Sequence, residues 1–275
     1  MTALKKAVTD EQLGALYRRT REFSDRVEKG VIPFATAMDH LQAAFAPGFS
    51  TGAGTRKIIS FAKAEKILGA DKVIEPSNFT KWCLSEMNLP IRYREQTLRA
   101  EDESNKKGET DFCLVYFPGD MSLIRQREIR GLDSKKPPYF DSGNYWWLGA
   151  EEKKCQEKGM AYWPKISSPA GFYLIDFKPR FADMNWQTQE AEISELGGQY
   201  ERTPEDVFLF AAQSIYMLTS KNITSVWWHW GKILDSDGYR VSVALFDDGE
   251  AHVFADPLDC SGGSLRVSVS RKFDF

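Results

Sequence analysis

Residues 1–48 carry two apolar stripes at helical spacing. The first stripe spans 13–27 and the second spans 34–45, and Gly30 and Pro33 separate them. Because glycine and proline interrupt helices, this pattern predicts a helical hairpin. Its apolar stripes must be buried, so we expect the hairpin to pack on the main domain or on a partner, for example in an oligomer formed through these helices.

The pattern between residues 49 and 159 is weaker and mixes helix with strand. Ile58–Leu68 and Asn78–Met87 predict short helices, whereas the apolar run Asp111–Phe117 predicts a buried strand. The charged run Arg99–Gly108 is typical of an exposed loop. The sequence predicts a mixed α/β region here and leaves open whether it belongs to the main domain.

The clearest pattern lies in residues 160–275. Gly171–Phe177 predicts a strand, and Thr203 as N-cap with Pro204 after it predicts the start of a helix. That helix is almost continuously apolar, so we expect it to be buried on most sides. Short alternating runs joined by turns then predict a β-meander with the strands Gly238–Phe246, Ala251–Phe254 and Leu265–Val269. This order of elements predicts an α+β domain.

Composition narrows the classes of function. The net charge is −3 and 42% of residues are hydrophobic, so we expect a packed core and no nucleic-acid partner bound through a basic face. No apolar stretch is long enough to insert into a membrane, and the N-terminus lacks a signal-peptide pattern, which predicts synthesis in the cytoplasm. The cysteines lack metal-ligand spacing, so neither a metal nor a cofactor is expected.

Two constellations predict a binding surface. In the run Trp227-Trp228-His229-Trp230 the side chains cannot all point the same way, so either two tryptophans belong to the core or some of the rings are displayed. Strand alternation predicts a second, outward set that mixes aromatic and small polar residues, which is typical of a binding surface. The outward set is Tyr239, Ser242, Ala244, His252 and Phe254, and the loop residues after it are Leu258, Asp259, Cys260, Ser261 and Ser264. Leu245, which alternation places with the inward valines, is also a candidate binding residue. The predicted core beneath comprises Val241, Val243, Phe246, Val253, Val267 and Val269.

The sequence favours a non-enzymatic protein. It contains no nucleophile elbow, phosphate loop or dinucleotide-binding fingerprint. Asp176 and Lys178 at the end of a strand, with Asp141 as a second acid, are the alternative: a metal-dependent nuclease.

The C-terminal motifs support a more specific hypothesis. Pro169–Asp176, Arg202–Val207, Asp237–Val243, Phe246–Gly249 and Ser268–Phe273 resemble a group of proteins from candidate-phylum bacteria, archaea and their viruses. Many members of that group resemble the variable proteins of diversity-generating retroelements. The Gly-Tyr-Arg run also resembles a strand of the phage major tropism determinant, another such protein. The resemblance covers roughly residues 160–275.

The resemblance implies a C-type-lectin fold of the branch shared with formylglycine-generating enzymes, preceded here by the helical N-terminal segment. It further implies that a reverse transcriptase alters the end of the gene at template adenines, and that the altered residues gather on one solvent-facing surface for selective binding of a protein or surface ligand. The final location stays open between a virion, a cell surface and the cytoplasm. A viral structural or interaction protein without diversification is the alternative. The calcium-ligand motif of carbohydrate-binding lectins is absent, so calcium-dependent sugar binding is not expected.

Overall fold

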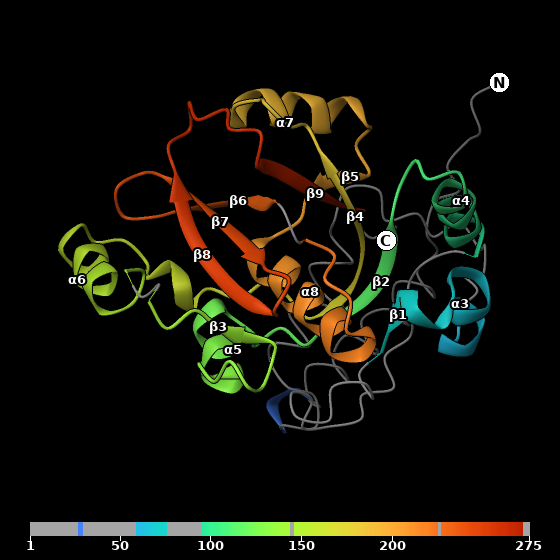
Figure 1. Cartoon of the computed structure of the whole chain (residues 1–275), viewed down its shortest axis with the longest axis horizontal. Helices are drawn as coiled ribbons and strands as arrows, with labels where there is room; N and C mark the ends of the chain where they lie inside the picture. The colour runs from blue at the N-terminus through green and yellow to red at the C-terminus, as the bar shows by residue number, and fades with distance from the viewer. Residues whose placement is uncertain (1–26, 30–58, 76–94, 144–145, 225–226, 272–275) are drawn as a thin grey trace, which may run out of the picture. The chain divides into compact units, whose positions relative to one another are not determined.

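The computed structural model describes residues 27–29, 59–75, 95–143, 146–224 and 227–271 (Figure 1). The chain divides into two compact units, residues 1–55 with Phe275 and residues 56–274. The predicted helical hairpin at 1–48, apart from residues 27–29, and the predicted helix Asn78–Met87 lie outside the described residues. All the other described residues belong to the second unit.

A large mixed sheet forms the centre of the second unit, and β1 and β3 are its two outermost strands. Its order is β1 (Val73–Ile74), β2 (Phe112–Phe117), β4 (Gly171–Arg180), β9 (Leu265–Arg271), β6 (Trp228–Leu234), β7 (Arg240–Leu245), β8 (Glu250–Asp256) and β3 (Tyr139–Phe140), and β5 (Tyr200–Arg202) also pairs with β9. The pairs β1–β2, β6–β9 and β3–β8 are parallel, and the other pairs are antiparallel. Strands from the middle of the chain therefore share one sheet with the C-terminal strands.

The described residues contain six α-helices, so the fold is mixed α/β. They are α3 (Phe61–Leu68), α4 (Glu95–Lys106), α5 (Leu123–Arg130), α6 (Gly149–Glu157), α7 (Trp186–Glu195) and α8 (Glu205–Thr219). Two short 3₁₀ turns, Ala70–Lys72 and Trp163–Lys165, accompany them. None of the helices in the described ranges is long and apolar enough to cross a membrane.

Helix α8 is the buried helix that the sequence predicts. Its residues from Val207 to Ile215 are all buried, and it packs against β6, β7 and β2. The buried valines Val241 and Val243 of β7 belong to the same core cluster. The helix begins one residue later than expected: Pro204 occupies the N-cap position without a side-chain cap, and Thr203 lies before it.

The prediction of a loop at Arg99–Gly108 is wrong, because α4 covers most of it. Leu98 and Glu101 are buried, so one face of the charged run packs against the rest of the unit. Pairs spaced four residues apart support the exposed face: Arg99 lies 2.7 Å from Glu95 and Lys106 lies 2.7 Å from Asp102.

The predicted meander is correct for β7 and β8 but wrong for β9. This strand pairs with β4 on one side and runs parallel to β6 on the other. Its two faces are both covered, since Val267 and Val269 pack with Ile193 of α7 whereas Ser268 contacts Thr203. A strand that is buried on both faces suits the middle of a sheet better than its edge.

Candidate functional site

The strands β6, β7 and β8 present two different faces. On the first face His229 stacks on Phe208 of α8 with ring centroids 4.2 Å apart, and Val243 pairs with the buried Val253. The second face carries the alternate residues, which begin with Trp228 on β6. Helix α7 covers the β9 part of this second face, and Figure 1 shows α7 beside β9. The part over β8 leaves Phe254 half exposed, and we call it the open part.

Four rings gather on the open part, and we call them the aromatic patch: Trp228, Phe246, His252 and Phe254. The indole of Trp228 lies 5.7 Å from Phe246, 6.0 Å from His252 and 5.9 Å from Phe254, measured between ring centroids. Phe246 and His252 meet edge to face at 4.6 Å. Half of the surface of Phe254 remains exposed. Aromatic rings that touch one another and still face solvent are typical anchors for a partner.

Strand β7 contributes short side chains between the rings of β6 and the rings of β8. Ser242 pairs with Phe254 and Ala244 pairs with His252, and both short side chains are fully buried. The Ser242 hydroxyl donates to Asp256 Oδ2 at 2.9 Å. The patch therefore stands on a floor of small residues that leaves room for the larger rings on either side.

A hollow of about 220 Å³ adjoins the patch. It is lined by Trp228, Phe254, Asp256, Cys260, Gly262, Ser264 and Leu265. The carbonyl of Ser264 accepts the backbone amide of Trp228 at 2.8 Å, which ties the loop after β8 to the start of β6. Burial raises the pKa of Asp256, and the hydrogen bond from Ser242 partly opposes that shift.

Carboxylates surround the other side of the patch. His252 Nε2 lies 2.7 Å from Glu250 Oε2, and its Nδ1 lies 3.4 Å from Asp141 Oδ2. The Tyr139 hydroxyl donates to Asp248 at 2.8 Å, which lowers the pKa of that carboxyl. The contacts with Glu250 and Asp141 fix the orientation of the His252 imidazole beside Trp228. Within the described ranges, no group of three or more His, Cys, Asp or Glu side chains is arranged to hold a metal ion.

The structure divides the predicted binding residues into two sets. Exposed or half-buried are Trp228, Tyr239, His252, Phe254, Leu258, Asp259, Ser261 and Ser264, together with Cys260. Fully or almost fully buried are Trp227, His229, Trp230, Ser242, Ala244 and Leu245. Trp227 and Trp230 confirm the alternative that two tryptophans of the run belong to the core. For His229, Ser242, Ala244 and Leu245, the expectation of a solvent-facing side chain is wrong. Phe246, which the sequence assigns to the core, is instead part of the aromatic patch.

Three of these buried residues have physical reasons for their positions. Trp227 packs on Phe208 and Leu245 faces the same core, so both support α8. The Nε2 atom of His229 lies 2.7 Å from the Thr203 carbonyl, and the backbone amide of Ser268 donates to its Nδ1 at 3.1 Å. His229 is therefore a structural link, and its burial lowers its pKa to about 3.

A charged cluster joins α7, α8, β5, β6 and β7, with Arg202 and Glu205 buried and Arg240 half-buried. The guanidinium groups of Arg202 and Arg240 lie 4.8 Å and 4.0 Å from the ring centroid of Trp186. Burial raises the pKa of Glu205 to about 7. Gly231 lies where the β6–β7 register shifts, and a Cβ at this position would overlap the Glu205 carboxyl group. The bulge thus makes room for a buried acid that ties the helix to the sheet.

The residues of the nuclease alternative are not brought together. Asp176 is fully buried, and its carboxylate accepts from the amides of Asp111 and Lys178 and from the Arg180 guanidinium at 2.6 Å. Asp141 follows β3, and four strands lie between β3 and β4 in the sheet order. At about 4.8 Å per strand, that arrangement is too wide for one metal ion to bind both acids.

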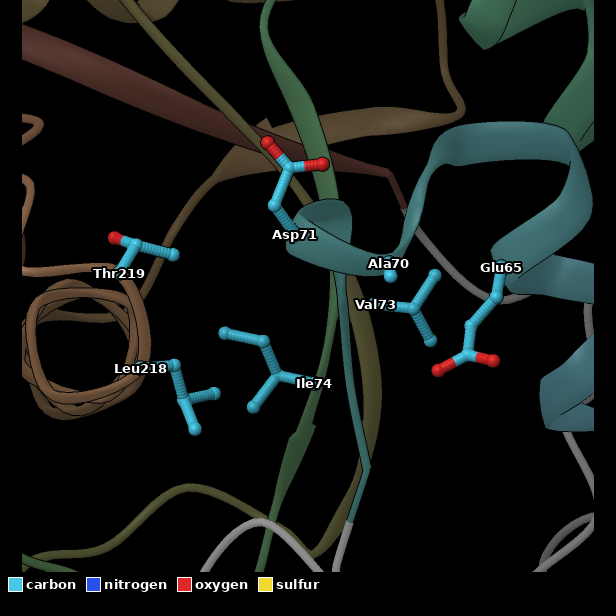
Figure 2. Close-up of a pocket in the computed structure, with 7 residues that line it drawn as sticks. All are labelled: Glu65, Ala70, Asp71, Val73, Ile74, Leu218 and Thr219. Carbon is cyan, nitrogen blue, oxygen red and sulfur yellow. The ribbon is translucent and has the colours of Figure 1, made fainter.

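A second hollow of about 260 Å³ lies between the first part of the unit and the end of α8. It is lined by Glu65, Ala70, Asp71, Val73, Ile74, Leu218 and Thr219. Figure 2 shows Leu218 facing Ile74, with Glu65 on the side away from α8. Its lining includes no aromatic ring, and none of these residues is among the binding residues that the sequence predicts.

Comparisons of the chain with family models, with characterised proteins and with solved structures find no significant match.

Proposed function

We propose that this protein is a ligand-binding protein of the retroelement-diversified kind, built on a C-type-lectin-like scaffold. The observation that carries the proposal is the aromatic patch, which lies open on a sheet whose opposite face is packed against α8. Its recognition surface consists of the patch and the loop that follows β8.

The division between buried and displayed residues supports this function. A diversified protein needs a backbone that keeps its shape while the displayed side chains change. Val241 and Val243 are fully buried on the α8 side, while Phe254 on the neighbouring strand is half exposed on the other side. Surface substitutions usually change stability by less than about 0.5 kcal/mol, so the displayed positions can vary without loss of the fold.

The first test is the pattern of natural variation. We expect copies of the gene from one population to differ at adenine positions of a nearby template, in codons for displayed residues such as Tyr239, His252 and Phe254. Codons for buried residues such as Trp230 and Ser242 should stay fixed, because changes there would disturb the core or the floor of the patch. Sequencing the end of the gene and its surroundings checks this. A uniform end without a template repeat would overturn diversification and leave a fixed interaction protein.

The second test separates binding from folding. We expect the triple variant Tyr239→Ala, His252→Ala and Phe254→Ala to melt within a few degrees of the wild type, since these side chains are exposed or half-buried. Peptides selected from a random display library against the wild-type chain should mostly fail to bind this variant, because aromatic anchors carry much of the affinity of an interface. Thermal melts and direct binding assays measure the two effects.

A matched control is Ile166→Ala, since Ile166 is 47% exposed and lies outside the patch. It should keep the binding of the selected peptides. If the melting temperature of the triple variant fell by a large amount, the assignment of these residues to the surface would be contradicted. If the control lost peptide binding to the same extent as the triple variant, the location of the binding surface would be contradicted.

A further inference from the structure

We infer that the aromatic patch takes a positively charged partner, specifically an arginine side chain presented by another protein. This inference rests on the proposed function and names the chemistry of the ligand. Three features support it: the charges around the patch, the geometry of its rings and acids, and the size of the adjoining hollow.

The segment that carries three of the four rings of the patch has charges of one sign. Residues 241–265 contain five acidic residues and no lysine or arginine. These acids are Asp247, Asp248, Glu250, Asp256 and Asp259, and Asp141 joins them through its contact with His252. The flanking cations are committed elsewhere, since Arg240 lies over Trp186 and Arg266 Nε donates to the Gly263 carbonyl at 3.1 Å. Such a surface attracts cationic partners and repels anionic ones.

The hollow combines the two groups that recognise a guanidinium. Trp228 and Phe254 offer ring faces, and the carboxylate of Asp256 lines the same hollow. A guanidinium is planar, stacks on aromatic rings and donates two parallel hydrogen bonds to a carboxylate, whereas the lysine ammonium does neither as well. Because Ser242 donates only to Oδ2 of Asp256, the carboxylate has capacity for further donors.

The chain already uses this pairing around Trp186 of α7. Both Arg202 and Arg240 lie over the ring of Trp186, at 4.8 Å and 4.0 Å from its centroid, and Arg202 Nε also donates to Glu190 at 2.6 Å. The hollow beside Trp228 has the ring and the acid of such a cluster without the arginine. Its volume of about 220 Å³ equals roughly seven water molecules, which is enough for one side chain and too small for a folded element.

The experiment analyses the peptides that bind the wild-type chain and lose binding to the double variant His252→Ala and Phe254→Ala, in which both changes lie in the aromatic patch. We expect these patch-dependent peptides to be enriched in arginine several-fold over the library and depleted in aspartate and glutamate. Replacing the critical arginine by glutamine should remove binding, and replacing it by lysine should weaken it. Affinity should also fall as salt is raised, because three of the acids, Asp247, Asp248 and Asp259, are exposed to solvent.

Charge variants of the protein provide the decisive comparison. Asp256→Asn with Asp259→Asn should weaken an arginine peptide about tenfold, since it removes charge without removing the rings. The matched control, Glu128→Gln with Asp133→Asn, removes two exposed acids of α5 and the following turn and should leave the affinity unchanged.

The outcomes distinguish this inference from the proposed function. Patch-dependent peptides without basic enrichment, or with affinities unaffected by Asp256→Asn and Asp259→Asn, would overturn the arginine site and leave the binding surface standing. If none of the selected peptides depended on the patch, the proposed function would fail and the inference with it. Thermal unfolding of each charge variant shows whether it is still folded, so that a loss of affinity can be attributed to the binding site.

Discussion

Val243→Asp is expected to prevent residues 56–274 from folding. Val243 is fully buried, pairs with Val253 on β8 and with His229 on β6, and faces the core that α8 covers. An aspartate there would bury a charge without a partner, which costs several kcal/mol. That cost is comparable with the whole stability of a typical domain, about 5–15 kcal/mol. Circular dichroism and thermal unfolding would detect the loss as a missing cooperative transition.

Phe254→Asp is the matched control, because it places the same charge on the next strand but on the open face. Phe254 is half exposed, so the carboxylate there stays hydrated and the melting transition should survive. If both variants unfolded alike, the open face would be part of the core. If Val243→Asp folded normally, the assignment of the α8 side as the interior would be wrong.

The second large effect is acid destabilisation through His229. Burial lowers its pKa from 6.5 to about 3 in the folded protein, whereas the unfolded chain takes up the proton near pH 6.5. The unfolded state therefore binds more protons between these values. The contribution of neutral His229 is fully present above pH 6.5 and is lost as the pH falls toward 3, by up to about 5 kcal/mol.

The pH dependence that Glu205 gives to the free energy of unfolding has the opposite sign over part of the same pH range. Burial raises its pKa from 4.5 to about 7, so its contribution is present below pH 4.5 and is lost as the pH rises through 7. Between about pH 4.5 and 6.5 the two groups oppose each other in the wild type. The effect of His229 is consequently visible only as a difference between two proteins that share Glu205.

His229→Gln provides that difference. A glutamine amide can donate toward the Thr203 carbonyl and accept from the Ser268 amide, as the imidazole does, but it does not titrate. Urea unfolding between pH 3 and 8 should show the wild type losing stability on acidification more steeply than His229→Gln, by about one proton at pH 5. Parallel curves for the two proteins would contradict the burial of a neutral histidine at this position.

The strongest elements were predictable because continuous runs of apolar residues mark their burial. Strand β2 and helix α8 follow from Asp111–Phe117 and from the apolar run after Pro204. Helix α4 was missed because its buried face consists of Leu98 and Glu101, and a charged residue at a buried position looks like part of a loop in the sequence. Glu101 is held there by an ion pair with Arg271, which lies far away in the sequence.

For the candidate site, the sequence could predict the face of the sheet on which most side chains lie. It could not predict how much of each side chain is exposed to solvent. Strand alternation placed Ser242 and Ala244 on the same side as Phe254, and the structure agrees. Whether a side chain on that face meets solvent depends on the size of its neighbours, and these two small residues are covered. Leu245 was predicted as a binding residue and Phe246 as a core residue, but the alternation set by Val241 and Val243 places Leu245 in the core and Phe246 on the open face, as the structure shows.

The place of β9 in the sheet has a consequence for how altered copies of this gene would be screened. The strand pairs with both β4 and β6, so it joins the β1–β2–β4 side of the sheet to the β6–β7–β8–β3 side. The displayed positions from Tyr239 to Ser264 all precede it in the chain. A copy whose reading frame broke within that stretch would lack the joining strand and leave two unpaired sheet edges, which proteases and chaperones recognise. If the proposed function holds, only copies read through β9 would yield a stable protein, so folding itself would remove truncated copies.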